Sequence, residues 1–197
     1  MLGAMSLPVR HNLVRAGAKR RGFTMIETMV TVAIVAILMA MAVPSMQKLI
    51  ARKRVAGVAS ELASDIRYLR SMGVQTATPV QIDFGANAAA TCYALSTDPF
   101  SGGACDCNNP ATCDGNSGTP KIVKTVTVPV SGGITVTVSN NSTHAVFAGP
   151  NSLPVNGAII TAIVSSSMGG SVKVLTNAAG RPFACSLLAQ ESNFPIC

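Results

Sequence analysis

The feature that most limits how this chain can fold is an apolar stretch near its N-terminus. From Phe23 to Val43 the sequence contains a single charged residue, Glu27. A helix of about twenty residues, at roughly 1.5 Å per residue, crosses the roughly 30 Å hydrocarbon core of a bilayer. A carboxylate in such a helix costs about 2.5–3.5 kcal/mol near its centre and less near an end. The stretch therefore predicts a membrane-spanning helix whose one acidic residue is kept for a partner.

Basic residues ahead of this stretch predict its orientation. Five of the fifteen Lys and Arg residues lie in the first 22 positions, which contain no acidic residue. Without that segment the chain has ten basic and eight acidic residues, so its net charge falls from +7 to +2. Positive charge beside a membrane-spanning helix tends to stay in the cytoplasm. We therefore expect a cytoplasmic N-terminus and an extracytoplasmic chain after Pro44.

The residues that flank the start of the apolar stretch form a specific motif. Lys19-Arg20-Arg21 precede Gly22, Phe23-Thr24-Met25-Ile26-Glu27 follow it, and Pro44 lies near the far end of the stretch. This arrangement resembles the class III leader of type IV pilins and type II secretion pseudopilins. The resemblance implies cleavage between Gly22 and Phe23 by a prepilin peptidase, methylation of the new amino group on Phe23, and assembly into a fibre.

In a fibre of parallel helices, the carboxylate of Glu27 can face the positive N-terminus of a neighbouring subunit, where an apolar medium strengthens the attraction. The alternative role is that Glu27 helps to cap the start of its own helix. Gly22 would serve the peptidase, because a residue without Cβ fits where others clash.

Two other interpretations of the N-terminal stretch are open. A plain single-span anchor would explain neither Glu27 nor the Gly22-Phe23 pair. An ordinary secretory signal could be cleaved near Ala40-Met41-Ala42, which has the small-x-small pattern of such sites. That cleavage would discard Glu27 and most of the apolar helix.

One continuous helix is expected from Phe23 to about Thr76, with an apolar half over 23–43 and an amphipathic half over 44–76. Pro44 should kink or locally open it, and Gly73 and Thr78-Pro79 should end it. Spacings of three and four mark one apolar face for packing on a sheet: Val55, Val58, Leu62, Ile66, Leu69 and Met72. Most charged side chains should fall outside this face: Arg54, Glu61, Asp65, Arg67 and Arg70.

Residues 77–197, called the head below, have the composition of an all-β region. Eight short strands are expected: 80–84, 92–96, 121–130, 134–139, 144–148, 158–165, 171–176 and 181–185. The first two should form a hairpin, and so should the third and fourth across Ser131-Gly132-Gly133. Residues 98–120 should form a surface loop. The predicted fold class is α+β and pilin-like, with a long N-terminal helix packed on antiparallel sheet.

All six cysteines lie in the head, where an extracytoplasmic location favours disulfides. Six cysteines allow 15 pairings: they are Cys92, Cys105, Cys107, Cys113, Cys185 and Cys197. We expect Cys185 to bridge to Cys197 and Cys92 to pair within the 105–113 group. A zinc site at Cys105, Cys107 and Cys113 is the alternative, but it lacks a second ligand pair.

Two sets of basic residues are candidates for binding. Lys48, Arg52, Lys53 and Arg54 follow the apolar stretch, so they could contact anionic lipid headgroups of the inner membrane or acids of a neighbouring subunit. A solvated helix face is the alternative. Arg181 and Lys173 are the candidates for contact with DNA. The whole head contains four basic and five acidic residues, which is a weak basis for binding phosphates.

A second resemblance is to the GspH/FimT-like minor pilins. It rests on the helix followed only by strands, the Asn-Ala-Ala-Gly-Arg segment at 177–181 and the C-terminal cysteine pair. Members implicated in DNA uptake carry Gly-Arg-x-Arg, whereas Phe183 takes the place of the second Arg here. We therefore expect a minor pilin or pseudopilin near a fibre tip, of a type IV pilus or a type II secretion system, with no catalytic residues, metal or cofactor. Capture of DNA for uptake is the alternative function.

Overall fold

Helix α1 (Met25–Thr76) is the first element and contributes to both units into which the chain divides, Met1–Met41 and Ala42–Cys197. The structure is a computed structural model that describes residues 22–97, 105–109, 113, 120–139, 143–157, 159–187 and 194–197. The predicted basic run of the leader, Lys19-Arg20-Arg21, lies outside the described residues. In the first unit every described residue is exposed.

The helix continues through Pro44, so the local opening expected there does not interrupt it. Its end at Thr76 agrees with the prediction, and Ala77 turns the chain away with a left-handed φ of 52°. Gly73 has a different role from the one expected. It lies inside the helix, and a Cβ there would come within 2.8 Å of Ser152 Oγ. The missing side chain thus permits close packing.

Two antiparallel sheets make up the β part of the second unit. The five-stranded sheet has the order β3-β2-β1-β5-β6 and the four-stranded sheet the order β4-β7-β8-β9. The strands are β1 (Val80–Ala86), β2 (Ala90–Thr97), β3 (Lys121–Pro129), β4 (Ile134–Val138), β5 (His144–Ala148), β6 (Leu153–Pro154), β7 (Thr161–Ser166), β8 (Ser171–Thr176) and β9 (Pro182–Ser186). Strands β5 and β8 have the predicted bounds, the other predicted strands occur with shifted ends, and β6 is an additional one. Ala158, expected to begin a strand, lies outside the described residues.

The first predicted hairpin is confirmed, and the second is wrong. Strands β1 and β2 pair antiparallel over their full length. Strand β3 pairs with β2 and strand β4 with β7, so the residues between β3 and β4 connect two sheets. This connection is a short 3₁₀ turn, Val130–Gly132, followed by Gly133 at a φ of 70°. It carries the chain from one sheet to the other instead of reversing it within one.

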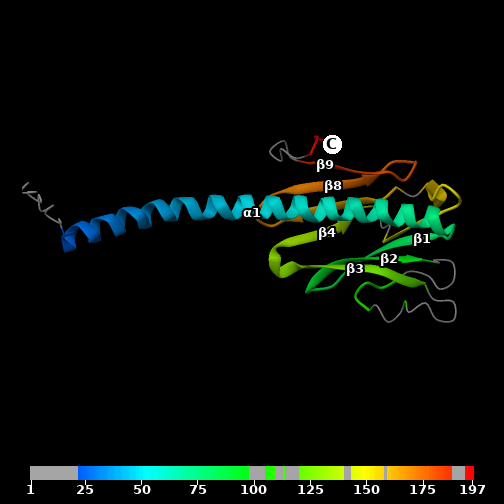
Figure 1. Cartoon of the computed structure of the whole chain (residues 1–197), viewed down its shortest axis with the longest axis horizontal. Coiled ribbons are helices and arrows are strands. Elements are labelled where there is room, and N and C mark those ends of the chain that lie inside the picture. Colours follow the sequence, from blue (N-terminus) through cyan, green and yellow to red (C-terminus); the bar gives the residue numbers. More distant parts are fainter. Residues whose placement is uncertain are drawn as a thin grey trace, which may run out of the picture. The chain divides into compact units, whose positions relative to one another are not determined.

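The main core lies between the second half of α1 and both sheets, and Figure 1 shows α1 lying across them. The predicted apolar face of the helix is confirmed, because Val55, Leu62, Ile66 and Leu69 are fully buried and Val58 and Met72 are partly buried against them. The core side chains from the strands include Ile82, Tyr93, Leu95, Val128, Val136, Phe147, Val164, Val172 and Val174. The fold is therefore a long helix packed on antiparallel sheet.

A smaller core covers the other face of the five-stranded sheet. It consists of Cys92 and Ala94 on β2 together with Cys105, Cys107 and Cys113 from the loop after it. Gly85 on β1 allows the close approach, because a Cβ there would lie 2.8 Å from Cys107 Sγ. The sheet is thus buried on both faces, on one of them mainly by cysteine side chains.

Candidate functional site

The start of α1 is exposed and capped by Thr24. The backbone N–H of Glu27 lies 3.1 Å from the carbonyl oxygen of Thr24 and 3.3 Å from its hydroxyl oxygen, which is the geometry of an N-cap. The carboxylate of Glu27 lies in the first turn, where negative charge is favourable. Within the described residues it has no hydrogen-bond or ion-pair partner. Phe23, just before the cap, is 80% exposed.

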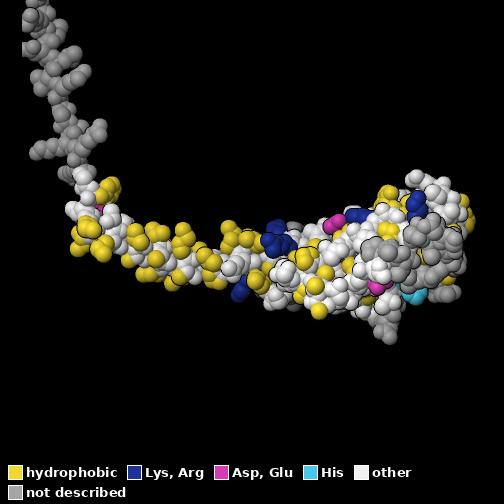
Figure 2. Space-filling model, turned by 90° about the horizontal axis from the view of Figure 1, so that it is seen from below, with side chains coloured by type: hydrophobic (Ala, Val, Ile, Leu, Met, Phe, Trp, Pro, Cys, Tyr) yellow, Lys and Arg dark blue, Asp and Glu magenta, His cyan; other side chains and the backbone are white. Residues whose placement is uncertain are grey.

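The side chains that follow Glu27 form an exposed apolar surface along the helix. In the described part of the chain, α1 is the one helix long and apolar enough to cross a membrane, and none of its most apolar window is buried. The exposed residues include Met25, Ile26, Met29, Val32, Ile34, Ile37, Leu38, Met39, Met41 and Val43. Figure 2 shows them as a yellow stretch of helix. An apolar surface of this extent indicates contact with lipid or with other proteins.

The four basic residues predicted to follow the apolar stretch lie on α1 within two turns. Lys48, Lys53 and Arg54 are exposed, and Arg52 is half-buried. Lys48 and Arg52 are four residues apart and so lie on one side of the helix. The structure thus gathers the four predicted basic residues in one segment of the helix, directly after the apolar stretch.

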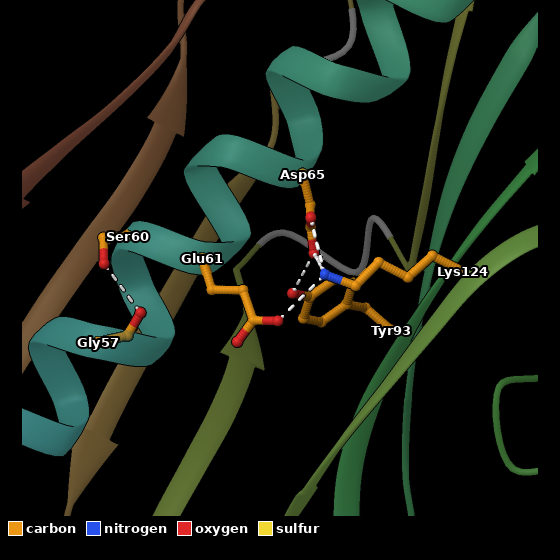
Figure 3. A network of polar contacts seen from close by, with 6 residues as sticks. All are labelled: Gly57, Ser60, Glu61, Asp65, Tyr93 and Lys124. Carbon is orange, nitrogen blue, oxygen red and sulfur yellow. Dashed lines mark hydrogen bonds and ion pairs between the residues drawn. The ribbon is translucent and has the colours of Figure 1, made fainter.

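A polar network connects α1 to the five-stranded sheet (Figure 3). Asp65, only 8% exposed, accepts a 2.7 Å hydrogen bond at Oδ2 from the hydroxyl of the fully buried Tyr93. The ammonium group of Lys124 on β3 lies 2.7 Å and 2.9 Å from the two oxygens of Asp65. It also lies 3.0 Å from Oε1 of Glu61, one turn earlier on the helix. One lysine therefore holds two carboxylates of α1 against the sheet.

The electrostatics of this network favour a charged Lys124 and a neutral Tyr93. The hydrogen bond to Asp65, together with the charges of Asp65 and Glu61, raises the pKa of Lys124. Burial, followed by the hydrogen bond to Asp65, raises the pKa of Tyr93. The contribution of Lys124 is therefore present at neutral pH and is lost only as the pH rises through its raised pKa. Both groups stabilise the packing of α1 on the five-stranded sheet through their bonds to Asp65.

A second buried carboxylate, Asp83 on β1, lies on the cysteine-covered face of the sheet. It is 2% exposed, its Oδ1 accepts a hydrogen bond from the amide of Gln81, and its Oδ2 has no hydrogen-bond partner in the described part of the chain. Burial raises its pKa to about 6, against smaller opposing effects that include the Gln81 hydrogen bond and the charge of His144. Asp83 is thus charged at neutral pH at a cost to stability.

We expect the substitution Asp83→Asn to stabilise the protein above pH 6. The folded chain binds the Asp83 proton more tightly than the unfolded chain, so the wild type loses stability as the pH rises from about 4 to about 6. The neutral amide removes this loss and should raise the free energy of unfolding by about 1–2 kcal/mol at pH 8, less than the full pKa shift because its NH₂ group is also buried. Urea unfolding at pH 8 and pH 4 measures the difference.

The matched control for this prediction is Asp106→Asn, which neutralises an exposed carboxylate of the loop that covers Asp83. This carboxylate is exposed and accepts hydrogen bonds from Asn108, so its replacement should not stabilise the protein at pH 8. An equal effect of Asp83→Asn at pH 4 and pH 8 would contradict the role assigned to the buried charge.

The six cysteines form three disulfides. Cys185 on β9 is bonded to Cys197, Cys92 on β2 to Cys107, and Cys105 to Cys113. The pairing places Cys92 with the 105–113 group and the C-terminal tail on β9, as expected. All three cysteines of the alternative zinc site are bonded in this way. Among the described residues no cluster of three His, Cys, Asp or Glu could hold a metal ion.

Arg181 lies just before β9, beside two arginines of α1 and away from Lys173. The three side chains line one surface pocket of about 420 Å³ together with Ser71, Val74 and Pro182. Lys173 on β8 is opposite Cys185, four residues along β9 from Arg181, and does not line this pocket. The structure therefore groups Arg181 with Arg67 and Arg70.

The sequence interpretation missed the roles of Asp65, Asp83 and the two helix arginines. Asp65 was expected outside the apolar face, but it follows Leu62 by three residues and precedes Leu69 by four, so its position on that face could have been read from spacing. Its partners Tyr93 and Lys124 come from separate strands. The grouping of Arg181 with Arg67, across more than 110 residues, has no signal in the sequence.

Two family models match this chain, one over its N-terminal segment and one over most of the rest. The family model of the prokaryotic N-terminal methylation motif matches residues 17–43. The family model of the type II transport protein GspH matches residues 58–180, which is more than half of the chain. No curated protein matches.

Two similar solved structures are crystal structures of the type IV minor pilin FimU of Pseudomonas aeruginosa strain PAO1. The one in space group P21 has 16% sequence identity and a TM-score of 0.49, and the match covers 73% of this chain and 94% of that chain. The one in space group P65 has 14% identity and a TM-score of 0.47, with coverages of 71% and 96%.

Proposed function

The chain belongs to the family of the type II transport protein GspH and carries a prokaryotic N-terminal methylation motif, and we propose from this that it is a fibre subunit. It is a minor pilin or pseudopilin that assembles into a type IV pilus or a type II secretion pseudopilus, at or near the tip. Its role is structural and rests on contacts with other subunits.

The observation that carries this proposal is the exposed apolar segment of α1 with the unpartnered carboxylate of Glu27 at its start. The segment is too apolar to remain in water, so it is placed first in the inner membrane and then against helices of other subunits. Glu27 gives these helices a fixed axial register, because its carboxylate is satisfied where the positive N-terminus of a neighbour lies beside it. Pro44, the first residue after this segment, acts in the same assembly.

In the membrane-bound precursor, the basic leader 1–22 stays in the cytoplasm and the head 77–197 lies in the periplasm. A prepilin peptidase removes the leader, and the mature chain begins with the N-terminal helix 23–76, apolar over 23–43 and amphipathic over 44–76, followed by the head. Lys48, Arg52, Lys53 and Arg54 follow the apolar segment, where they contact anionic lipid headgroups before assembly.

Mass spectrometry of the mature N-terminal peptide tests the processing step. We expect the chain to begin at Phe23 with a methylated amino group. In the variant Gly22→Val the peptide should retain the leader, because a branched side chain clashes where the peptidase accepts glycine. A Cβ at Gly22 meets no described atom within 4 Å, so the fold itself should tolerate this change. A mature chain that begins after Ala42, or that keeps the leader in the wild type, would contradict the proposal.

Capture of DNA for uptake is a second candidate function, favoured by the grouping of Arg181 with Arg67 and Arg70. The charge balance of the head and Phe183 in place of a second arginine weigh against it. Binding of DNA by the full chain in detergent micelles at low salt tests it, and an absence of binding would remove this candidate.

A further inference from the structure

The pocket formed by Arg67, Arg70 and Arg181 has a lining that the proposed assembly of the fibre does not use. Arg67 and Arg70 lie one turn apart on α1, and Arg181 reaches the same pocket from the chain segment before β9. Val74 and Pro182 supply apolar walls, and Ser71 supplies a hydroxyl group. We call these six residues the arginine pocket.

Hydrogen bonds to the backbone hold the guanidinium groups of Arg67 and Arg70, and a turn positions the backbone of Arg181. Nε of Arg70 donates to the carbonyl oxygen of Ser152 at 3.1 Å, and a terminal nitrogen of Arg67 lies 3.4 Å from the carbonyl oxygen of Pro182. The backbone N–H of Arg181 is bound to the side-chain oxygen of Asn177 at 2.9 Å, which closes a tight turn. The bonds of Arg67 and Arg70 each use one of five guanidinium donors, and that of Arg181 uses none, so several guanidinium donors remain for a ligand.

The positive charge of the arginine pocket is not balanced by the described part of the chain. No acidic residue lines it, and within the described residues none of the three arginines forms an ion pair. Burial and the nearby charge of Arg181 lower the pKa of Arg70, which shows that the two cations repel each other. An anion bound between them would relieve this repulsion.

We propose that the arginine pocket binds a carboxylate side chain of an acidic segment on a partner protein. The planar guanidinium forks match the two oxygens of a carboxylate, and such charge-assisted hydrogen bonds are among the strong ones. Val74 and Pro182 are placed to contact the aliphatic part of a Glu or Asp side chain. The pocket lies in the second unit and uses no residue of the apolar segment, so the site does not depend on the proposed assembly contact of Glu27.

A carboxylate fits this site better than a nucleic acid. A phosphate chain is bound by cations spread along its length, and the affinity rises with the number of phosphates contacted. Here the three cations are confined to one pocket, Lys173 is separate, and the head as a whole carries five acidic against four basic residues. The pocket therefore suits a single carboxylate better than an extended chain of phosphates.

The test measures binding of fluorescein-labelled hexaglutamate to the full chain in detergent micelles, by fluorescence anisotropy at low salt. We expect the Kd to rise by about tenfold in Arg181→Gln and in Arg67→Gln, since each removes a charge-assisted bond. Arg70 is not substituted, because its side chain also donates a hydrogen bond to the backbone carbonyl of Ser152. Lys121→Gln is the control, an exposed cation of β3 that does not line the pocket, and should change the Kd by less than about twofold. Hexaglutamine should not bind.

Three results would overturn the proposal. The first is an unchanged Kd in Arg181→Gln and Arg67→Gln, and the second is an equal loss in Lys121→Gln, which would indicate attraction to general positive charge. The third is tighter binding of single-stranded oligothymidylate than of hexaglutamate, weakened by the same two substitutions. The leader is identical in every variant, so its basic residues cannot produce the expected difference.

Discussion

Incorporation of the Glu27→Ala variant into fibres is expected to fall by about tenfold or more, which corresponds to at least about 1.4 kcal/mol of lost subunit affinity. The carboxylate of Glu27 has no partner in the described part of the chain, and Thr24 rather than Glu27 supplies the side-chain cap of the helix. Its removal therefore leaves the helix start intact. What is lost is the attraction to a neighbouring N-terminus in an apolar medium, where charge pairs are strong.

The measurement compares the amount of the subunit in sheared fibres with the amount in the membrane. Membrane insertion and leader cleavage should be unchanged in Glu27→Ala, because neither requires a carboxylate at this position. Glu27→Asp should retain part of the incorporation. Glu61→Ala is the matched control, since it removes one exposed acid from the same helix. Normal incorporation of Glu27→Ala would refute the role assigned to this residue.

The second large effect is expected from Asp65→Ala, which should lower the free energy of unfolding by about 2–3 kcal/mol. The substitution removes the acceptor for the fully buried hydroxyl of Tyr93 and the nearer partner of Lys124. An unsatisfied buried hydroxyl accounts for most of the loss, because the side chain of Lys124 is 37% exposed and its ion pair is screened by water. Urea unfolding of the full chain in detergent micelles, followed by pulse proteolysis, measures it.

Two further variants separate the buried interaction from the surface one. Glu61→Ala removes the other carboxylate bound to Lys124, which is exposed, and should cost less than about 0.5 kcal/mol. Tyr93→Phe, introduced into Asp65→Ala, should restore about 1 kcal/mol because no buried hydroxyl is then left unpaired. Equal losses from Asp65→Ala and Glu61→Ala would show that burial of Asp65 contributes nothing.

The elements of this fold could be predicted from sequence where the signal is local. The periodic residues of α1 from Val55 to Met72 mark its buried face, and β-branched runs mark strands such as Ser171–Thr176. Local sequence patterns could not predict which strands pair with one another. The segments that form β3 and β4 look like a hairpin, because apolar and polar residues alternate in both and a Gly pair separates them. In the structure, however, β3 pairs with β2 and β4 pairs with β7.

Some residues of the candidate site could likewise be predicted from sequence, and others could not. Gly22, Phe23 and Glu27 are recognisable because their spacing is the motif, and the exposed apolar helix that follows needs no tertiary context. Asp65 and the arginine pocket depend on side chains contributed by several elements, and no pattern along the chain encodes which polar groups will meet. These contacts exist only once helix and sheets have packed.

The cysteine-covered face of the five-stranded sheet makes the finished head depend on the compartment in which it folds. On that face Cys92, Cys105, Cys107 and Cys113 take the place that large aliphatic side chains hold in the main core. Their bonds form in an oxidising environment and not in the cytosol. While these cysteines are reduced, the bonds that hold this layer on the sheet are missing, and the cover over Asp83 is weaker. Oxidation is then the step that completes this part of the fold, so the full stability of the five-stranded sheet depends on the redox state of its surroundings.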